Sequence, residues 1–425
     1  MPDMSGVARG KIMPAAKYCE IECMNLPEAL LLLTVTGDYP EDVRAINPSD
    51  GDIFCRGDAS TIRLVPWALE PTAQIIHDCF YPNGSPVEGA PRHVLRRVLG
   101  LYEARGWKPV VAPELEFYLV KPNTDPDYPL EPPIGRSGRA ESGRQSYSID
   151  ALAEHEPLIE EIYEFCEAQD IRLDTLNHES GAAQMEINLI HGDPLELADQ
   201  AFLFKRTVRE AAHRHGMYAT FMAKPMEQEP GSAMHIHQSV VDLETGKNAF
   251  SDTDGGESPL FSAHIAGLQK YLPAAMSVLA PNVNSYRRIT RWYAAPINLQ
   301  WGYDNRTTGL RVPNSEPEAM RVENRVGGAD ANPYLAIAAS LACGYLGMIE
   351  KLEPSEPLEG SAYELPYSLP NGLQESLSLL RASRPLIDAL GEHFALAFTA
   401  VKDGELNHFH KVISSWEREF LLLNV

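Results

Sequence analysis

The sequence predicts a mixed helix-and-strand protein in two parts, a small strand-rich N-terminal part and a larger part in which strands and helices follow one another. Up to about residue 90 the chain has short strand-like segments, with turn signals at 36–38, 48–51 and 81–84. The Pro- and Gly-rich stretch 85–92 then opens an amphipathic helix at 93–105, so we expect a domain boundary near residue 88. Beyond this boundary, several segments alternate apolar and polar residues with the period of two-faced strands.

Length and composition are those of a soluble globular protein. The chain has 425 residues, of which 44% are hydrophobic and 22% charged, enough for one large domain and a small one, or for two to three domains. The longest apolar run, 29–35, is too short to span a bilayer, and no basic segment with a cleavage site precedes it. We therefore expect this run to be a buried strand in a cytoplasmic protein.

Charge and cysteine usage exclude several classes of partner and site. A net charge of −23 disfavours nucleic acid and anionic membranes as partners, because it repels phosphate, whereas a cationic substrate is tolerated. The six cysteines form no C-x-x-C pair, which argues against a disulfide framework and against a structural zinc site. We expect them to be reduced thiols.

The expected elements of the larger part follow in order along the chain. They are a strand at 113–120, a long Pro-, Gly- and Arg-rich loop at 121–143, a helix at 151–169, strand-like residues at 177–190, a helix at 194–215, a strand at 234–241, a helix at 261–279, an Arg-rich region at 286–325, and an apolar helix of small residues at 333–350. Loops as long as 121–143 are often functional.

The first strand of this part places two carboxylates side by side. In PELEFYLV, residues 113–120, apolar residues alternate with Glu114, Glu116 and Tyr118. Residues i and i+2 of a strand lie roughly 6 to 7 Å apart, so the two charges repel each other unless that face meets water or a cation. For a single strand, a solvated outer face is the simpler interpretation.

Three further segments share the same pattern of one apolar and one polar face. Their polar positions are Glu186 and Asn188 in QMEINLI, His235, His237 and Ser239 in MHIHQS, and Arg321, Glu323 and Arg325 in RVENRV. A solvated face would more often mix Lys, Thr, Ser and Gln. If these strands belong to one curved sheet, their polar sides line a common trough.

The residue types in this trough indicate phosphoryl transfer. Carboxylates with one or two imidazoles suit Mg²⁺ or Mn²⁺, and two such ions would relieve the repulsion between Glu114 and Glu116. Planar donors for phosphate and carboxylate oxygens come from a set of arginines, namely Arg288, Arg306, Arg311, Arg321 and Arg325. No P-loop or dinucleotide motif occurs in a strand-to-helix context. Each signal alone also fits a structural role, such as a core histidine or an ion-pair network.

At this point the motifs resemble those of the glutamine synthetase superfamily, over nearly the whole chain. The matching stretches are DMSGVARGK (3–11), APELEFYLV, ESGAAQMEINL (179–189), KPMEQEPGSAMHIHQS (224–239), APNVNSYRR (280–288), NRTTGLRVP (305–313), RVENR (321–325) and GADANPYLA (328–336). The resemblance implies an α+β fold, with a β-grasp domain at 1–88 and a catalytic domain at 89–425 whose curved antiparallel sheet, flanked by helices, forms a funnel. Because family members carry a helix and a strand before the first motif, the β-grasp domain is expected to be clipped at its start.

The same resemblance implies ATP, two Mg²⁺ or Mn²⁺ ions, a γ-glutamyl phosphate intermediate and a cytoplasmic homo-oligomer, a double ring like a dodecamer. The ligands carried over for one ion are Glu116, Glu179 and Glu186, and those for the other are Glu114, His235 and Glu323. The nucleotide positions are His237, Ser239, Arg311 and Arg321; Arg306 and Arg321 also touch the transferring phosphoryl group, so that with Glu323 they form the catalytic set. The glutamate positions are Gly231, Arg288 and Arg325.

The departures from the family pattern concern the acceptor. Ammonia-using members place a Glu six residues after the arginine that Arg288 matches, where it deprotonates ammonium; this chain has Ala294. An Asp contributed across a subunit interface aligns with Thr34, with Asp38 nearby, and the loop before MHIH carries Pro230 and Ala233. The phrasing is closest to the γ-glutamylpolyamine synthetases, of the glutamate–putrescine ligase type.

We therefore expect an ATP-dependent ligase that joins the γ-carboxylate of glutamate to a primary amine or polyamine. Two alternatives remain: a glutamine synthetase with an altered ammonium site, and a catalytically silent homologue that senses polyamines. The preferred amine is open, and so is the base that deprotonates it, for which residues of the 36–42 turn or of the 286–294 loop are candidates.

Overall fold

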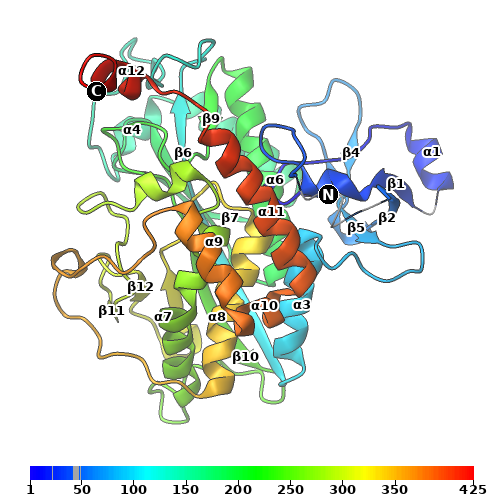
Figure 1. Ribbon diagram of the computed structural model, residues 1–425, viewed down its shortest axis with the longest axis vertical. Coiled ribbons are helices and arrows are strands. Elements are labelled where there is room, and N and C mark those ends of the chain that lie inside the picture. The colour runs from blue at the N-terminus through cyan, green and yellow to red at the C-terminus, as the bar shows by residue number, and fades with distance from the viewer. Residues whose placement is uncertain (22, 42–46, 48) are drawn as a thin grey trace.

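One large sheet forms the centre of the computed structural model, which describes residues 1–425 apart from 22, 42–46 and 48 (Figure 1). Its strands lie in the order β11-β12-β13-β10-β6-β8-β7, and β9 pairs with β6. The bounds are β6 (Trp107–Val120), β7 (Leu173–His178), β8 (Gln184–Leu189), β9 (Tyr218–Thr220), β10 (Met234–Asp242), β11 (Trp301–Tyr303), β12 (Leu310–Val312) and β13 (Val322–Asn324). Neighbouring strands are antiparallel except for the parallel pair β11 and β12, which corrects the expectation of a wholly antiparallel sheet.

Long helices flank this sheet and bury its apolar face. They are α3 (Pro91–Glu103), α5 (Glu156–Ala168), α6 (Pro194–Arg214), α7 (Pro259–Leu279) and α8 (Pro333–Glu350). The alternating apolar residues of the strands, such as Leu115, Phe117, Met185 and Ile236, are fully buried in this core. The strand prediction for these segments is thus confirmed, and their other face is left for polar side chains.

Helices α7 and α8 pack closely because glycines meet at their contact. A Cβ added at Gly347 would lie 2.1 Å from the Ala263 carbonyl oxygen and 2.5 Å from the Gly267 Cα. The expected close-packing helix at 333–350 is therefore confirmed. By length and composition α8 is also the one helix among the described residues that could cross a membrane, but 89% of it is buried inside the protein, so we interpret it as a core helix.

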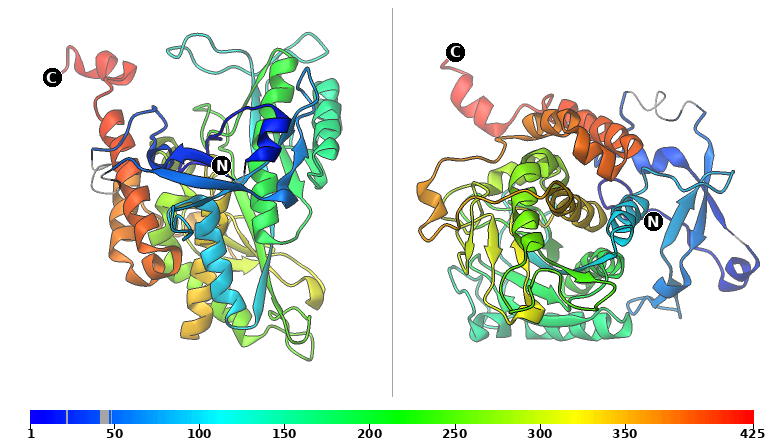
Figure 2. Two further views of the ribbon diagram at one scale, coloured as in Figure 1. Left: turned by 90° about the vertical axis from the view of Figure 1, so that its right-hand side faces the viewer. Right: turned by 90° about the horizontal axis from the view of Figure 1, so that it is seen from below.

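The N-terminal part lies to one side of the large sheet and has a small sheet of its own (Figure 2). This sheet is antiparallel, with the order β1 (Met24–Pro27), β2 (Asp52–Gly57) and β5 (His77–Phe80), and the short strands β3 (Arg63–Leu64) and β4 (Ala73–Gln74) pair beside it. The helix α1 (Ala15–Glu20) precedes it. A separate apolar cluster that includes Leu26, Ile53 and Cys55 stabilises it. Whether this part is a β-grasp domain stays a prediction.

A buried arginine connects the N-terminal part to the rest of the molecule. Arg92, at the start of α3, is 3% exposed and donates to Asp78 at 2.7 Å and to Asp58 at 3.0 Å, both in the N-terminal part. It also donates to both carboxylate oxygens of Asp199 on α6, at 2.9 and 2.7 Å. Because these bonds use the guanidinium from several sides, they fix the direction in which the small sheet leaves the large part.

The chain from residue 373 onward is mostly helical. Its elements are α9 (Leu373–Ala382), α10 (Arg384–Leu390), α11 (Glu392–Phe409) and α12 (Ser415–Leu421), and the last of these extends away from the body of the molecule (Figure 2). The remaining short helix, α4 (Ile149–Ala153), precedes α5.

Three expectations about secondary structure were wrong. The apolar run 29–35 is not a strand: a 3₁₀ helix covers Glu28–Leu32, in which Leu31 and Leu32 are buried. A short apolar run without alternation does not distinguish a helix from a strand. The helix at 151–169 is split into α4 and α5, with Pro157 in the first turn of α5, where its missing N–H costs no hydrogen bond. The strand-like residues 177–190 form two strands joined by a turn at 179–183, in which Ala183 has φ +55°.

The long loop at 121–143 is confirmed as irregular, with one isolated bridge between Ile134 and Ala140. All six cysteines lie among the described residues and are free thiols, as expected, and four of them are buried.

Candidate active site

The polar faces of four strands meet because of their pairing register. His235 on β10 lies opposite Glu114 on β6, and Glu186 on β8 lies opposite Glu116. On the other side of β10, Glu323 on β13 lies opposite His237. Side chains opposite each other on paired strands point to the same face. The trough expected from the alternating pattern is therefore present.

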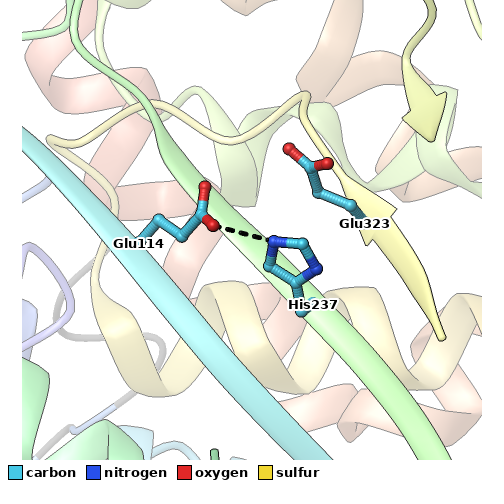
Figure 3. A group of neighbouring side chains, drawn as sticks. All are labelled: Glu114, His237 and Glu323. Atoms are coloured by element: carbon cyan, nitrogen blue, oxygen red, sulfur yellow. Dashed lines mark hydrogen bonds and ion pairs between the residues drawn. The ribbon is translucent and has the colours of Figure 1, made fainter. Parts of the chain in front are cut away.

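Carboxylates and imidazoles lie within hydrogen-bonding or ligand distance of one another at the middle of this face (Figure 3). Glu114 contacts both histidines, with Oε1 at 2.9 Å from His237 Nε2 and Oε2 at 3.2 Å from His235 Nδ1. His235 Nδ1 is 3.7 Å from a Glu323 oxygen and Nε2 is 3.9 Å from a Glu116 oxygen. Ligand atoms within 4.8 Å of one another form two trios, Glu114 with His237 and Glu323, and Glu114 with Glu186 and His235.

Most of this face is buried. Glu116 is 8% exposed, His235 5% and Glu323 1%. A surface explanation for paired carboxylates therefore does not apply to this chain, and the repulsion between them has to be relieved in another way.

Burial and crowding split the carboxylates into two groups. Burial and the charge of Glu179 raise the pKa of Glu116 to about 8, and burial with the charges of Glu114 and Glu116 raises the pKa of Glu186 to about 10. Burial would also raise the pKa of Glu323, but the charge of Arg325, followed by those of the imidazoles, holds it at about 2. Without a cation, part of the cluster thus keeps protons that its acidic groups would ordinarily lose at neutral pH.

The residues of the cluster fit divalent cations. His235 Nε2 is buried, and among the described residues it has no hydrogen-bond partner, so its position suits a metal ligand. The surrounding ligand groups are carboxylates. Without a cation, burial and mutual repulsion would favour their protonated forms. Carboxylate oxygens with one or two imidazoles match the preferences of Mg²⁺ and Mn²⁺ more closely than those of Zn²⁺.

A cleft of 1630 Å³ opens beside this cluster. Its wall contains Glu114, His237 and Ser239 together with three of the predicted arginines, Arg306, Arg311 and Arg321. Arg321 Nε donates to His237 Nδ1 at 3.2 Å, and Arg311 donates to Glu323 at 2.8 Å. The cleft is therefore lined by cations next to the carboxylate cluster, an arrangement suited to polyphosphate.

The comparisons with known proteins agree with this arrangement. The model of the glutamine synthetase catalytic domain matches residues 88–421. The chain is 36% identical to γ-glutamylputrescine synthetase PuuA of Escherichia coli (strain K12), covering 100% of this chain and 91% of that protein, and 35% identical to a glutamate–isopropylamine ligase of a Pseudomonas species, covering 98% and 92%. A solved structure of GmaS without ligand superimposes with a TM-score of 0.84 at 29% identity, covering 99% of this chain and 95% of that one.

The chain belongs to the glutamine synthetase family. It is a ligase with the mixed helix and sheet fold of that family, in which helices flank a curved sheet. Enzymes of this family use ATP and divalent metal ions.

The glutamate positions carried over from the glutamine synthetase family lie next to one another. A Cβ on Gly231 would lie 2.5 Å from the Arg288 Cγ and from the Ala223 carbonyl oxygen, so only glycine fits there. Arg288 donates to the carbonyl oxygens of Val326 at 2.9 Å and Arg325 at 3.0 Å, and Arg325 in turn pairs with Glu323. This end of the glutamine synthetase site is thus connected to the carboxylate cluster through backbone and ion-pair contacts.

Glu179 lies at the turn between β7 and β8. Its side chain accepts a hydrogen bond from Asn177 at 3.0 Å, and its charge is among the causes that raise the pKa of both Glu116 and Glu186. All residues predicted for the metal ions therefore lie in or beside the cluster, whereas the division of six ligands between two ions stays a prediction.

One site residue was missed. Gln184 Nε2 donates to Glu116 Oε2 at 3.2 Å and to the Gly231 carbonyl oxygen at 3.0 Å, so it connects the carboxylate cluster to Gly231. It precedes Glu186 by two residues and therefore shares its strand face. The alternating pattern could have identified it.

The departures from the glutamine synthetase pattern lie outside the central strands: Ala294 in a turn, Pro230 and Thr34 in irregular segments, and Ala233 in an isolated bridge with Gly328. Ala294 is exposed and has φ +59° in a turn at 291–294. The Pro230 carbonyl oxygen accepts a hydrogen bond from Tyr118, and the Ala233 N–H donates to Glu116 at 2.8 Å. Thr34 closes a turn with Asp38, whose carbonyl oxygen is 2.9 Å from the Thr34 nitrogen.

Neither the 36–42 turn nor the 286–294 loop identifies the base for the acceptor. Within the first, residue 42 lies outside the part of the chain that the structure describes, and Asp38 accepts a hydrogen bond from Thr36 at 2.9 Å. The second contains no carboxylate or histidine.

Proposed function

We propose that the protein joins the γ-carboxylate of glutamate to a primary amine or polyamine in an ATP-dependent reaction that passes through γ-glutamyl phosphate. The observation that carries this proposal is Ala294: the carboxylate that would bind ammonium is replaced by a methyl group, while the acid, imidazole and arginine sets are intact. The names of the relatives, which include ligases for putrescine and isopropylamine, support an organic amine as acceptor.

In this proposal each group of residues has one role. Glu116, Glu179 and Glu186 hold one Mg²⁺ or Mn²⁺ ion and Glu114, His235 and Glu323 hold the other, and these ions neutralise phosphate charge when bound. His237, Ser239, Arg311 and Arg321 bind ATP in the cleft, and Arg306 with Arg321 contacts the phosphoryl group during transfer. Gly231, Arg288 and Arg325 bind and orient glutamate. Glu323 also keeps Arg311 and Arg325 in position, because it pairs with both.

The chemistry follows from charge placement. ATP transfers its terminal phosphoryl group to the γ-carboxylate of glutamate and leaves as ADP. The neutral amine then attacks the acyl carbon, phosphate departs, and the amine loses one proton to give the amide. Negative charge moves from ATP to glutamate and then to the departing phosphate. The arginines can stabilise it without moving, because carboxylates and backbone carbonyls hold them in place.

We further propose a β-grasp domain at 1–88, a catalytic domain at 89–425, a cytoplasmic location and a homo-oligomer arranged as a double ring. The apolar segment 412–425 at the C-terminus supports assembly. Its large apolar side chains are exposed, with Trp416 at 61% and Leu423 at 90%. An exposed patch of this kind is typical of an interface. Light scattering after gel filtration tests assembly, and a monomer at micromolar concentration contradicts it.

The test of the function is an acceptor panel. Glutamate-dependent conversion of ATP to ADP is measured with putrescine, spermidine, cadaverine, ethanolamine, isopropylamine and ammonia, and mass spectrometry identifies the γ-glutamyl product. We expect at least one organic amine to exceed ammonia in kcat/KM. Ammonia as the best acceptor would make the protein a glutamine synthetase with an altered ammonium site. No turnover with any acceptor, together with an Arg306→Ala variant that binds ligands like the parent, would indicate a silent polyamine sensor.

A further inference from the structure

The long loop at 121–143 has no part in the proposed function, but its last third is anchored at two points. At the first, the Ser137 N–H donates to Glu154, the residue after α4, at 3.0 Å. The second is Glu141, whose side chain is only 5% exposed. Carboxylates are almost never buried unless they are paired, so the partner of Glu141 indicates what this part of the loop does.

The partner of Glu141 is His178, the last residue of β7. Its Nε2 lies 3.1 and 3.2 Å from the two carboxylate oxygens, and the imidazole is fully buried. Among the described residues, no other basic side chain lies within 4.0 Å of this carboxylate. Burial lowers the pKa of His155, on which the charges of Glu141 and His178 also act, so His155 is uncharged at neutral pH and leaves Glu141 to His178.

His178 also contacts the main chain of Glu179, which is proposed as a metal ligand. Its Nδ1 lies 2.7 Å from the Glu179 carbonyl oxygen. Because both ring nitrogens of His178 face acceptors, both carry a proton and each donates one hydrogen bond. The Glu179 N–H in turn donates to the Gln184 carbonyl oxygen at 2.8 Å. Both polar groups of the Glu179 main chain are therefore held.

Strand alternation places this support behind the carboxylate cluster. His178 lies opposite Met185 on the apolar face of the sheet, whereas Asn177 points to the face of the cluster. From that face, Asn177 donates to the Glu179 carboxylate at 3.0 Å. Glu141 and His178 do not line the cleft. Glu179 is thus held from both faces of the sheet, and the loop supplies the charge on the buried face.

We propose that Glu141 is a positioning residue for the metal site: through His178 it fixes the main chain of Glu179, and so directs the Glu179 carboxylate toward a divalent cation. This inference rests on the proposed function, in which Glu179 is a ligand, and it gives the long loop a role. Without the charge of Glu141, the buried imidazolium of His178 loses its counter-ion. Groups that orient metal ligands typically change metal affinity by about 10- to 100-fold.

Mn²⁺ binding in the absence of nucleotide tests the inference, with free Mn²⁺ measured at pH 7.5 by its electron paramagnetic resonance signal. The parent is expected to bind two ions per chain. Glu141→Gln keeps the shape of the side chain and removes its charge. We expect this variant to raise the Kd of one ion by about tenfold, while the Kd of the other ion stays within about twofold of the parental value.

A second variant tests the route through the imidazole. His178→Asn retains a donor near the position of Nδ1 and removes the group that faces Glu141. It should raise the Kd of the same single ion. If Glu141 acts through His178, the double variant binds Mn²⁺ no more weakly than the weaker of the two single variants, because the two losses are not independent. If Glu141→Gln does not fold, the two Kd values of His178→Asn decide the test.

The matched control is Glu131→Gln, the same substitution in the same loop at an exposed pair with Lys121, and it should leave both Kd values parental. Circular dichroism in EDTA shows whether each variant is folded at the temperature of the titration. Parental Kd values in a folded Glu141→Gln protein would overturn the inference even if its melting temperature falls, as would an equal rise of both Kd values or additive losses in the double variant. A parent that binds no Mn²⁺ would instead overturn the metal set of the proposed function.

Discussion

The two ends of the site are built differently. At the end proposed to hold the metal ions and the nucleotide, Glu114, Glu186, His237 and Glu323 stand on paired strands, and their positions are fixed by the sheet register. At the end proposed to hold glutamate and the acceptor, the residues come from irregular segments and the 3₁₀ helix Val283–Arg288, beside the turn around Tyr293. Strands hold a constellation of charges rigidly, and turns can change without disturbing the sheet. The difference implies that reaction chemistry is constant on this scaffold, whereas acceptor choice resides in the turns.

Loss of a strand residue should give the largest effect. Glu323→Gln removes the charge that faces Arg311, Arg325 and His235 from a side chain that is 1% exposed. We expect kcat to fall at least about 100-fold with every acceptor, because the arginines lose their fixed partner. Steady-state kinetics measure this, and the exposed Glu356→Gln serves as control. A loss confined to one acceptor would contradict the division between the two ends.

A residue of the irregular segment before β10 should give a smaller and more selective effect. Gly231→Ala places a Cβ against Arg288 and the Ala223 carbonyl oxygen. An overpacked contact of this kind costs about 1 to 3 kcal/mol, so we expect KM for glutamate to rise about tenfold while KM for ATP stays within about twofold. The control is Gly10→Ala, where the added Cβ meets no atom within 4 Å. Equal changes in both KM values would show that the two ends are not separable.

A third prediction concerns the pH dependence of stability without metal. The pKa of Glu186 in the folded protein is raised to about 10. At pH values above the ordinary pKa of glutamate, the folded state therefore binds more protons than the unfolded state. The free energy of unfolding then decreases as pH rises, by up to about 1.4 kcal/mol per pH unit for this carboxyl. In EDTA, Glu186→Gln should therefore gain thermal stability relative to the parent between pH 6 and pH 9.

The prediction concerns the difference in stability between the Glu186→Gln variant and the parent, because other groups change the free energy of unfolding with pH in the opposite direction. Burial lowers the pKa of Lys205 to about 7, so its folded form binds fewer protons than the unfolded one above that pH, and stability rises. Lys205 is present in both proteins and cancels. If the difference in melting temperature between the variant and the parent stays constant from pH 6 to pH 9, the pKa of Glu186 is not raised by its neighbours.

The same division explains what could be predicted from the sequence. A period of two places Glu116, His235 and Glu323 on one face of each strand without knowledge of the fold, and the motifs of the resemblance add Glu179 and Gly231. Nothing in the sequence brings Glu141 to His178, which are 37 residues apart, because loops have no period that fixes direction. The error at 29–35 has the same origin, since an apolar run without alternation does not reveal which backbone it adopts.

The bonds of Arg92 restrict how relatives can exchange parts. Its guanidinium is shared between Asp58 and Asp78 on one side and Asp199 on the other, so it links the two parts. A chimaera that joins this chain to the N-terminal segment of a relative has to preserve both aspartates, or Arg92 keeps only its pair with Asp199 and no longer holds the two parts together. Recombination libraries for new acceptors should therefore cross over within the turns of the site and leave this junction intact.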